Sequence, residues 1–219
     1  MKRLLFFICA IILITSCKQS GQFEISGTIR NSEDKKLILS ELLVSGTQEV
    51  ESVKLDKKGN FKIKASTDIP KFYQLAISKN NFITLLIESG EKITIEGDAK
   101  DMRKVKISGS EGSILAQKIN NQLAETKHKL DSIINYIKTI QGTPKYDQEI
   151  DQLNNSYASI VNAQRDSSIV LIINNMDSMA SISPLYQKYD HQHLVLYKNR
   201  ELQYIKIVSE ALNKKYPES

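Results

Sequence analysis

Phe23-Glu24-Ile25-Ser26-Gly27-Thr28-Ile29 is the stretch that decides the fold class of this chain. Its apolar residues alternate with polar ones, which is the two-residue period of a β-strand with one face in a core. Short runs of the same character continue through residues 36–44, 48–55, 61–65, 72–78, 82–89, 92–96 and 104–108. About eight short strands with no helix between them predict an antiparallel β-sandwich or open barrel over residues 23–109.

The connections between these runs have the composition of tight turns. In Asp56-Lys57-Lys58-Gly59-Asn60, Gly59 can adopt the positive φ that a sharp reversal needs, so we expect a β-hairpin between residues 48–55 and 61–65. Asn80-Asn81 and Ser89-Gly90-Glu91 are equally short and favour hairpins as well.

From Ser110 the apolar residues recur at steps of four and three, the period of a helix that faces a partner helix. They include Ile119, Leu123, Leu130, Ile133, Ile137 and Ile140. Gly142-Thr143-Pro144 then ends the helix, and Thr143 is suited to cap a second helix with Pro144 in its first turn. Because residues 146–160 resume the same rhythm, the sequence predicts an antiparallel helical hairpin.

The last part of the chain predicts two further helices. Residues 169–173 are apolar on every side, so we expect that turn to be enclosed. A short third helix is predicted around residues 181–184, and a fourth from His193 to Tyr216, ended by Pro217. The expected fold class is α+β, with a β-sandwich or open barrel at residues 23–109 followed by an α-helical hairpin or bundle at residues 110–219.

The N-terminus has the pattern of a bacterial export signal. Lys2 and Arg3 precede an apolar run, residues 4–14, that is shorter than the roughly 20 residues needed to span a bilayer. Ile14-Thr15-Ser16-Cys17 then resembles a lipobox, the site where a lipoprotein is cleaved and lipidated. We therefore predict a signal peptide at residues 1–16 and a lipidated tether at residues 17–22. The alternative is an ordinary secretory signal with a chance cysteine.

Lipidation at Cys17 predicts stable attachment to a membrane, because several acyl chains anchor a protein far more firmly than one. Lys18 offers no acidic retention signal of the inner-membrane type, so we expect the outer membrane, with the protein facing the periplasm. A partner in the envelope is also expected, although the sequence does not identify it.

Charge and cysteine content exclude several classes of function. The formal charge of +5 falls to +3 after loss of Lys2 and Arg3, with no basic run or stripe, so a nucleic-acid binder is not expected. Cys9 lies in the signal, which leaves Cys17 as the single cysteine of the mature chain. A C-x-x-C pair or a free peroxidatic thiol is thereby excluded for this polypeptide.

Few residues suggest a metal site or catalysis. His191 and His193 lie at the expected start of the fourth helix with Asp190 nearby, but a stable metal site needs three or four convergent ligands, so no metal is predicted. His128 is expected on a solvated helix face, and Asp56 in a turn, not a calcium loop. Phosphate loops, a nucleophile elbow and a supported carboxylate pair are not found, and neither a catalytic residue nor a cofactor is predicted.

Other residues suggest binding. Ser110 is expected to cap the first helix, with an anion at that N-terminus as the less favoured alternative. The tyrosines of the helical part are expected at the edge of the core, not in a ligand platform; they are Tyr136, Tyr146, Tyr157, Tyr186, Tyr189, Tyr197 and Tyr204. A carbohydrate-binding sandwich is a third possibility, in which Tyr73 and Phe82 would replace the missing Trp.

The order of these features resembles a known family. The opening stretch at residues 23–29, the segment 52–61, Ile87-Glu88-Ser89-Gly90-Glu91 and residues 105–110 followed by a long helix are similar to the N-terminal domain of unknown function 4369. The resemblance implies a β-module and a helical segment that precede a thioredoxin-like domain in membrane-anchored thiol-disulfide oxidoreductases or peroxiredoxin-like proteins. This sequence departs from that pattern because no C-x-x-C follows, so no catalytic residue can be transferred to it.

Two functions are therefore considered. The first is a lipid-anchored, non-enzymatic envelope protein whose modules bind another envelope component or act as a spacer. The alternative is the N-terminal part of a thiol-disulfide oxidoreductase, inactive without its thioredoxin-like domain.

Overall fold

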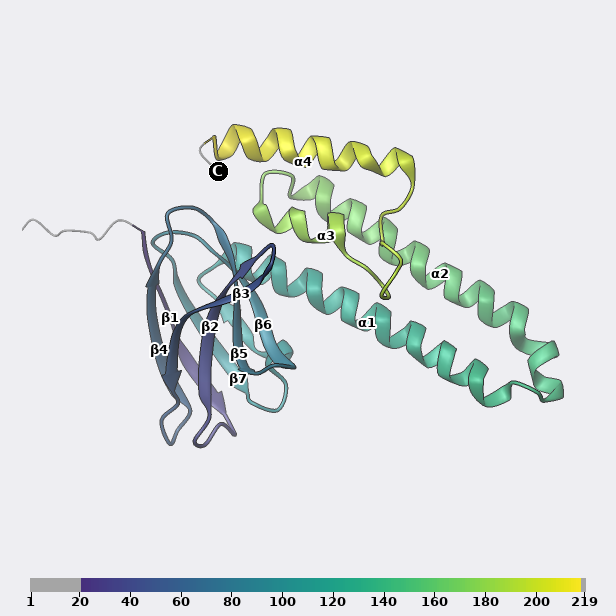
Figure 1. Cartoon of the computed structure of the whole chain (residues 1–219), viewed down its shortest axis with the longest axis horizontal. Helices are drawn as coiled ribbons and strands as arrows, with labels where there is room; N and C mark the ends of the chain where they lie inside the picture. Colours follow the sequence, from purple (N-terminus) through teal and green to yellow (C-terminus); the bar gives the residue numbers. More distant parts are fainter. Residues whose placement is uncertain (1–20, 218–219) are drawn as a thin grey trace, which may run out of the picture.

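The computed structural model describes residues 21–217, which form a β-module of two sheets followed by a helical module (Figure 1). The first sheet has the strand order β4 (Asn60–Ser66), β1 (Gln22–Arg30), β7 (Lys92–Asp98) and β8 (Lys106–Ser108). The second has the order β3 (Gly46–Lys54), β2 (Lys36–Leu43), β5 (Lys71–Ser78) and β6 (Asn81–Ile87). The α+β class is confirmed, and the two sheets are open. The predicted signal peptide and the predicted lipidation site Cys17 lie outside the described residues.

The alternating apolar residues meet between the two sheets and form one core. Ile25 and Ile95 of the first sheet and Leu39, Leu75 and Leu85 of the second are completely buried in it. Burial of large aliphatic side chains is the main favourable term in folding, so the period-two pattern accounts for the packing of the sheets. β1 begins at Gln22, one residue before the predicted start of the β-module at Phe23.

One strand pair differs from the antiparallel prediction. β1 and β7 are parallel, with Gly27 opposite Ile95, while the other ladders are antiparallel. Gly27 has φ 153°, and a Cβ atom there would lie 1.8 Å from the Ile95 carbonyl oxygen. Glycine thus permits the close approach of the two backbones, which a strand pattern alone does not reveal.

Two predicted hairpins are wrong as pairings, although their turns are present. Gly59 has φ 81° and its N–H donates to the Asp56 carbonyl, so the reversal occurs as predicted. However, β3 and β4 belong to different sheets, and so do β6 and β7. The Gly59 carbonyl instead accepts from Ile29 N–H of β1 at 2.9 Å. Turn chemistry fixes a reversal, but packing against the core decides whether the chain stays in one sheet or crosses to the other. The β5–β6 hairpin at Asn80-Asn81 is confirmed.

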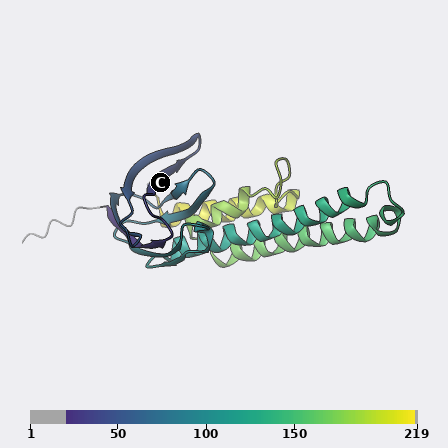
Figure 2. The ribbon, with the colours of Figure 1, turned by 90° about the horizontal axis from the view of Figure 1, so that it is seen from below.

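The helical hairpin is confirmed. α1 (Glu111–Ile140) is capped by Ser110, whose Oγ accepts from Ser113 N–H at 3.2 Å. α2 (Pro144–Asn174) begins with Pro144 after Thr143, whose hydroxyl donates to the Ile140 carbonyl and makes no capping bond. The two helices lie side by side, and their joined ends extend away from the β-module (Figure 2).

Shorter helices cover the half of this hairpin nearest the β-module (Figure 1). They are the 3₁₀ turns η2 (Met179–Ser181) and η3 (Asn199–Glu201) with α3 (Ile182–Tyr186) and α4 (Leu202–Lys215). The predicted start of the fourth helix at His193 is wrong. The Asp190 carboxylate accepts from the backbone N–H groups of Gln192 and His193 and so stabilises a local turn in place of a helix.

The apolar turn at residues 169–173 is only partly enclosed, contrary to prediction. Ile172 is fully buried, but Val170 and Ile173 are 56% and 47% exposed, so this turn of α2 has one buried and one solvent-facing side. In residues 21–217, no helix is both long and apolar enough to cross a membrane.

Candidate functional site

A hollow in the described structure runs between strand β6, the loop around the 3₁₀ turn η1 (Met102–Lys104) and the first half of α1. We call it the β6–α1 groove. Its main part, about 620 Å³, is lined by Asn80, Asn81, Phe82, Ile83, Thr84, Lys100, Asp101, Arg103, Gln117, Asn120 and Asn121. A shallower extension of about 390 Å³ continues along α1 past Lys104, Ala124, Glu125, His128 and Lys129.

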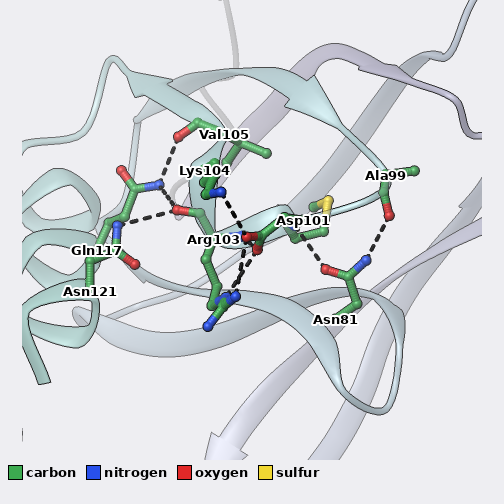
Figure 3. Close-up of polar contacts among 9 residues, drawn as sticks. Asn81, Ala99, Asp101, Arg103, Lys104, Val105, Gln117 and Asn121 are labelled. Atoms are coloured by element: carbon green, nitrogen blue, oxygen red, sulfur yellow. Dashed lines mark hydrogen bonds and ion pairs between the residues drawn. The ribbon is translucent and has the colours of Figure 1, made fainter. Parts of the chain in front are cut away.

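Asn81 fixes the loop on one side of the groove. Its Oδ1 accepts from Met102 N–H at 2.8 Å, and its Nδ2 donates to the Ala99 carbonyl at 2.7 Å (Figure 3). A single amide at the start of β6 therefore satisfies both a donor and an acceptor of the loop. Met102 itself is completely buried in the β-module core, which fixes the loop from the other side.

α1 fixes the same loop through two amides one helical turn apart. Gln117 Nε2 donates to the carbonyls of Val105 and Arg103, at 2.7 and 3.2 Å, and Asn121 Nδ2 donates to the Arg103 carbonyl at 3.2 Å (Figure 3). Residues separated by four in a helix lie on one face, so both amides reach the loop together. The groove is thus built by both modules.

Asp101 and Arg103 form the central charged pair of the groove. Arg103 Nε and Nη2 donate to the two carboxylate oxygens at 3.0 and 3.1 Å, and Lys104 Nζ lies 3.7 Å from the same carboxylate. The hydrogen bond from Arg103 lowers the pKa of Asp101, and the same bond raises the pKa of Arg103. Asp101 also accepts from Arg103 N–H and so caps the turn. Both groups are therefore occupied in holding the loop.

The groove carries an excess of positive charge. Lys100, Arg103, Lys104 and Lys129 line it, against Asp101 and Glu125. Within residues 21–217, the ion pairs among the groove residues join Asp101 to Arg103 and to Lys104. Lys100 and Lys129 form no ion pair in that part of the chain. The electrostatics therefore favour an acidic ligand.

The aromatic residues proposed for carbohydrate binding are separated by the structure. Tyr73 is 1% exposed in the β-module core, where its ring lies 5.3 Å from that of Phe23, so it cannot serve as a platform. Phe82 is 38% exposed and lines the groove. One exposed ring remains from the proposed pair.

His193 lies beside Asp190 and Tyr189. His193 Nδ1 is 2.7 Å from Asp190 Oδ2, and its ring stacks on Tyr189 with centroids 5.6 Å apart, in a loop and not at a helix start. Partial desolvation raises the pKa of Asp190, but hydrogen bonds from His193 and Gln192 outweigh it and lower that pKa to about 2. Among residues 21–217, no three His, Cys, Asp or Glu side chains are grouped as a metal site would require. His128 is exposed, as expected, at the rim of the groove extension.

The remaining candidates have structural positions. Asp56 accepts from the N–H groups of Lys58 and Asn60 in its turn, as predicted. The tyrosine prediction holds in part. Tyr146, Tyr157, Tyr189 and Tyr204 are half-buried, whereas Tyr136, Tyr186 and Tyr197 are exposed.

Sequence reasoning missed most of the groove. The sequence predicts only a turn at Asn80-Asn81 and gives no element or site for residues 99–103. The clearest signal is the density of amides in two places, Asn80-Asn81 and residues 117–122, because amides outside a turn often hydrogen-bond a loop or a ligand. Their convergence depends on strand order, which the sequence does not encode locally.

Comparison with known families gives one result. Residues 23–114, from β1 to the first residues of α1, match the family model described as "Domain of unknown function (DUF4369)". The resemblance of the β-module to this family is therefore confirmed. No curated protein matches the chain.

Proposed function

We propose that this protein is a lipid-anchored, non-catalytic binding module of the cell envelope. Cys17 would hold it to the membrane, by expectation the outer membrane with the protein facing the periplasm, and the β6–α1 groove would bind another envelope component. The observation that carries the proposal is the groove itself, an open hollow whose loop is fixed by amides from both modules while Lys100 and Phe82 remain exposed on its surface. Preorganised polar groups around one exposed ring are typical of a binding site.

The anchor is tested by replacing the lipidated residue. We expect Cys17→Ser to move the protein from the membrane fraction to the soluble fraction, or to leave it unprocessed, because the acyl chains supply the membrane affinity. Fractionation with metabolic fatty-acid labelling measures this. Label that persists on the variant would contradict the assignment of Cys17.

The groove is tested in intact cells with a photoreactive amino acid at Asn120. The same amino acid at Lys57, in the exposed Asp56–Asn60 turn, is the matched control. We expect crosslinks to an envelope component at a yield at least several-fold higher from position 120. Equal yields from both positions would contradict binding in the groove.

The resemblance to this family, whose β-module is matched at residues 23–114, implies a second candidate, the N-terminal part of a thiol-disulfide oxidoreductase. In that case the groove would contact a thioredoxin-like domain, encoded further along the gene or supplied by another chain. The nucleotide sequence beyond codon 219 distinguishes the candidates. An in-frame C-x-x-C region after a frameshift or early stop favours the second, and an unrelated gene favours the first.

A further inference from the structure

The main-chain groups at one end of β6 show which way its free edge faces. The Leu86 carbonyl accepts from the hydroxyls of Ser110 and Ser113, at 3.1 and 2.8 Å, and the Glu88 N–H donates to the Glu91 carboxylate at 3.0 Å. β6 is the last strand of the second sheet and pairs only with β5. The Leu86 carbonyl therefore points away from β5, and Ser110 and Ser113 of this chain cover that end of the edge.

The same direction applies to Phe82 and Thr84. In an antiparallel ladder, residues alternate between those that exchange hydrogen bonds with the neighbouring strand and those whose main-chain groups point away from it. Phe82 and Thr84 are four and two residues before Leu86, in an unbroken register with β5 from residue 82 to 87. Their N–H and C=O groups consequently point to the free edge.

The hydrogen bonds at the opposite edge of the second sheet, between β2 and β3, lead to the same assignment of the residues of β6. Leu55 N–H donates to the Lys35 carbonyl at the start of the β2–β3 ladder, so the odd-numbered residues of β2 before its bulge face β3. Even-numbered residues of β2 then face β5, where Ile38 is opposite Ala76. The even-numbered residues of β5 therefore bond to β2, and its odd-numbered residues bond to the odd-numbered residues of β6 that lie opposite them. The main-chain groups of the even-numbered residues of β6 are left pointing to the free edge.

This part of the edge is open and forms a wall of the groove. Among residues 21–217, no hydrogen bond outside the β5 ladder satisfies the main-chain groups of Phe82 or Thr84. Ile83 also lines the groove although its side chain is in the core, which indicates that the backbone of β6 forms the surface there. An exposed strand edge is a template for pairing with an extended chain.

We propose that the β6–α1 groove binds an extended, acidic peptide segment of a partner protein, which adds as a strand to β6 at Phe82 and Thr84. This inference rests on the proposed binding function and names its partner class. Main-chain hydrogen bonds to the edge supply affinity, and alternate side chains of the peptide face opposite sides. One set faces α1, with Asn120 and Gln117, and the other faces the cationic loop with Lys100.

Binding of a model peptide tests the inference. The full chain in detergent micelles is titrated with acetyl-Thr-Glu-Thr-Glu-Thr-Glu-amide, and backbone hydrogen exchange is followed over residues 80–86. We expect slower exchange in that segment. The same peptide N-methylated at alternate residues, and its Lys-for-Glu analogue, should bind at least about tenfold more weakly, because they remove the donors or the complementary charge.

Two pairs of variants locate the contact. Thr84→Pro removes an N–H that points to the edge, a position where strands tolerate proline, and should weaken binding at least about tenfold. Its control is Ser52→Pro on β3, the opposite edge strand of the same sheet. There the Ser52 N–H donates to the side chain of the adjacent Glu51 and not to another strand. If Thr84→Pro fails to fold, Lys100→Glu with the control Lys57→Glu gives the same comparison through charge.

The outcomes separate this inference from the proposed function. Peptide binding that depends on the donors of the peptide and on Thr84 supports strand addition. No binding of the peptide, equal binding by its N-methylated form, or binding of an N-acetylglucosamine tetramer in its place overturns strand addition. In each of these cases, crosslinking from position 120 in cells decides separately whether the groove binds an envelope component.

Discussion

The β-module and the helical module bury different kinds of side chain. The core between the sheets is apolar, with completely buried residues such as Ile25, Leu75 and Ile95. The described helical module has fewer fully buried apolar residues, notably Ile172 and Val195. Its interior also holds polar residues, namely Thr126, Gln164, Arg165, Ser168, Ser181, Gln187 and Glu201.

The polar interior of the helical module centres on one buried ion pair. Arg165 Nε lies 3.5 Å from Glu201 Oε1, with side chains 9% and 3% exposed, and Glu201 Oε2 accepts from Lys198 N–H at 2.8 Å. In the described chain, the buried side-chain atoms without a hydrogen-bond partner belong to Arg165, Gln187 and Glu201. Such a network specifies one packing more than it stabilises it. We expect that apolar burial stabilises the β-module, whereas polar pairing contributes to the arrangement of the helices.

Truncation of matched isoleucines should show this difference most strongly. Ile95→Ala and Ile172→Ala each remove the same atoms from a fully buried site. We expect Ile95→Ala to lower the free energy of unfolding by about 4 kcal/mol and Ile172→Ala by about 2 kcal/mol, because partly exposed helices can close over a cavity more easily than two sheets can. Urea unfolding of the full chain measures both values. Equal costs would remove the proposed difference between the cores.

The buried ion pair should give the next largest effect. Glu201→Gln leaves the Arg165 guanidinium buried with only the exposed Asp166 as a charged partner at 3.0 Å, so we expect a loss of about 2–3 kcal/mol. The matched control is Glu210→Gln, which removes the exposed pair with Lys206 and should cost less than about 0.5 kcal/mol. Thermal unfolding of both variants measures the difference. A negligible effect of Glu201→Gln would show that the helical module, too, depends on apolar burial alone.

The contrast between the modules also explains what could be predicted from the sequence. Period-two alternation at residues 23–29 and the four-three rhythm from Ile119 to Ile140 are local, so the fold class, most strands and the helical hairpin followed from them. Membership of each strand in a sheet is not local. The reversals at Gly59 and Gly90 have the residues of hairpins, yet both carry the chain to the other sheet.

The groove could be predicted even less. Its wall is the free edge of β6, which exists only because β5 and not β7 is its neighbour, and its loop is fixed by Asn81 and Gln117 from segments far apart in sequence. The buried pair of Arg165 and Glu201 is equally non-local. Both features depend on tertiary packing, for which no local pattern exists.

The smallest expected effect lies where the two modules meet, at Glu91 beside Ser110. Burial raises the pKa of the Glu91 carboxyl, despite its hydrogen bonds with Glu88 N–H and Ser110. A folded pKa above the unfolded one means that this group favours folding fully below the unfolded pKa, near 4.3, and that the contribution is lost as pH rises through the folded pKa.

Glu91→Gln keeps an acceptor for Glu88 N–H and removes the charge, so it should stabilise the protein at pH 7 by less than about 1 kcal/mol and have no effect at about pH 3.5. Urea midpoints at both pH values measure this, with the exposed Glu96→Gln as control. If Glu91→Gln stabilises the protein at pH 3.5 as much as at pH 7, the carboxylate charge is not the cause. Ionisation of Glu91, where the β-module meets the helices, would then not destabilise the fold.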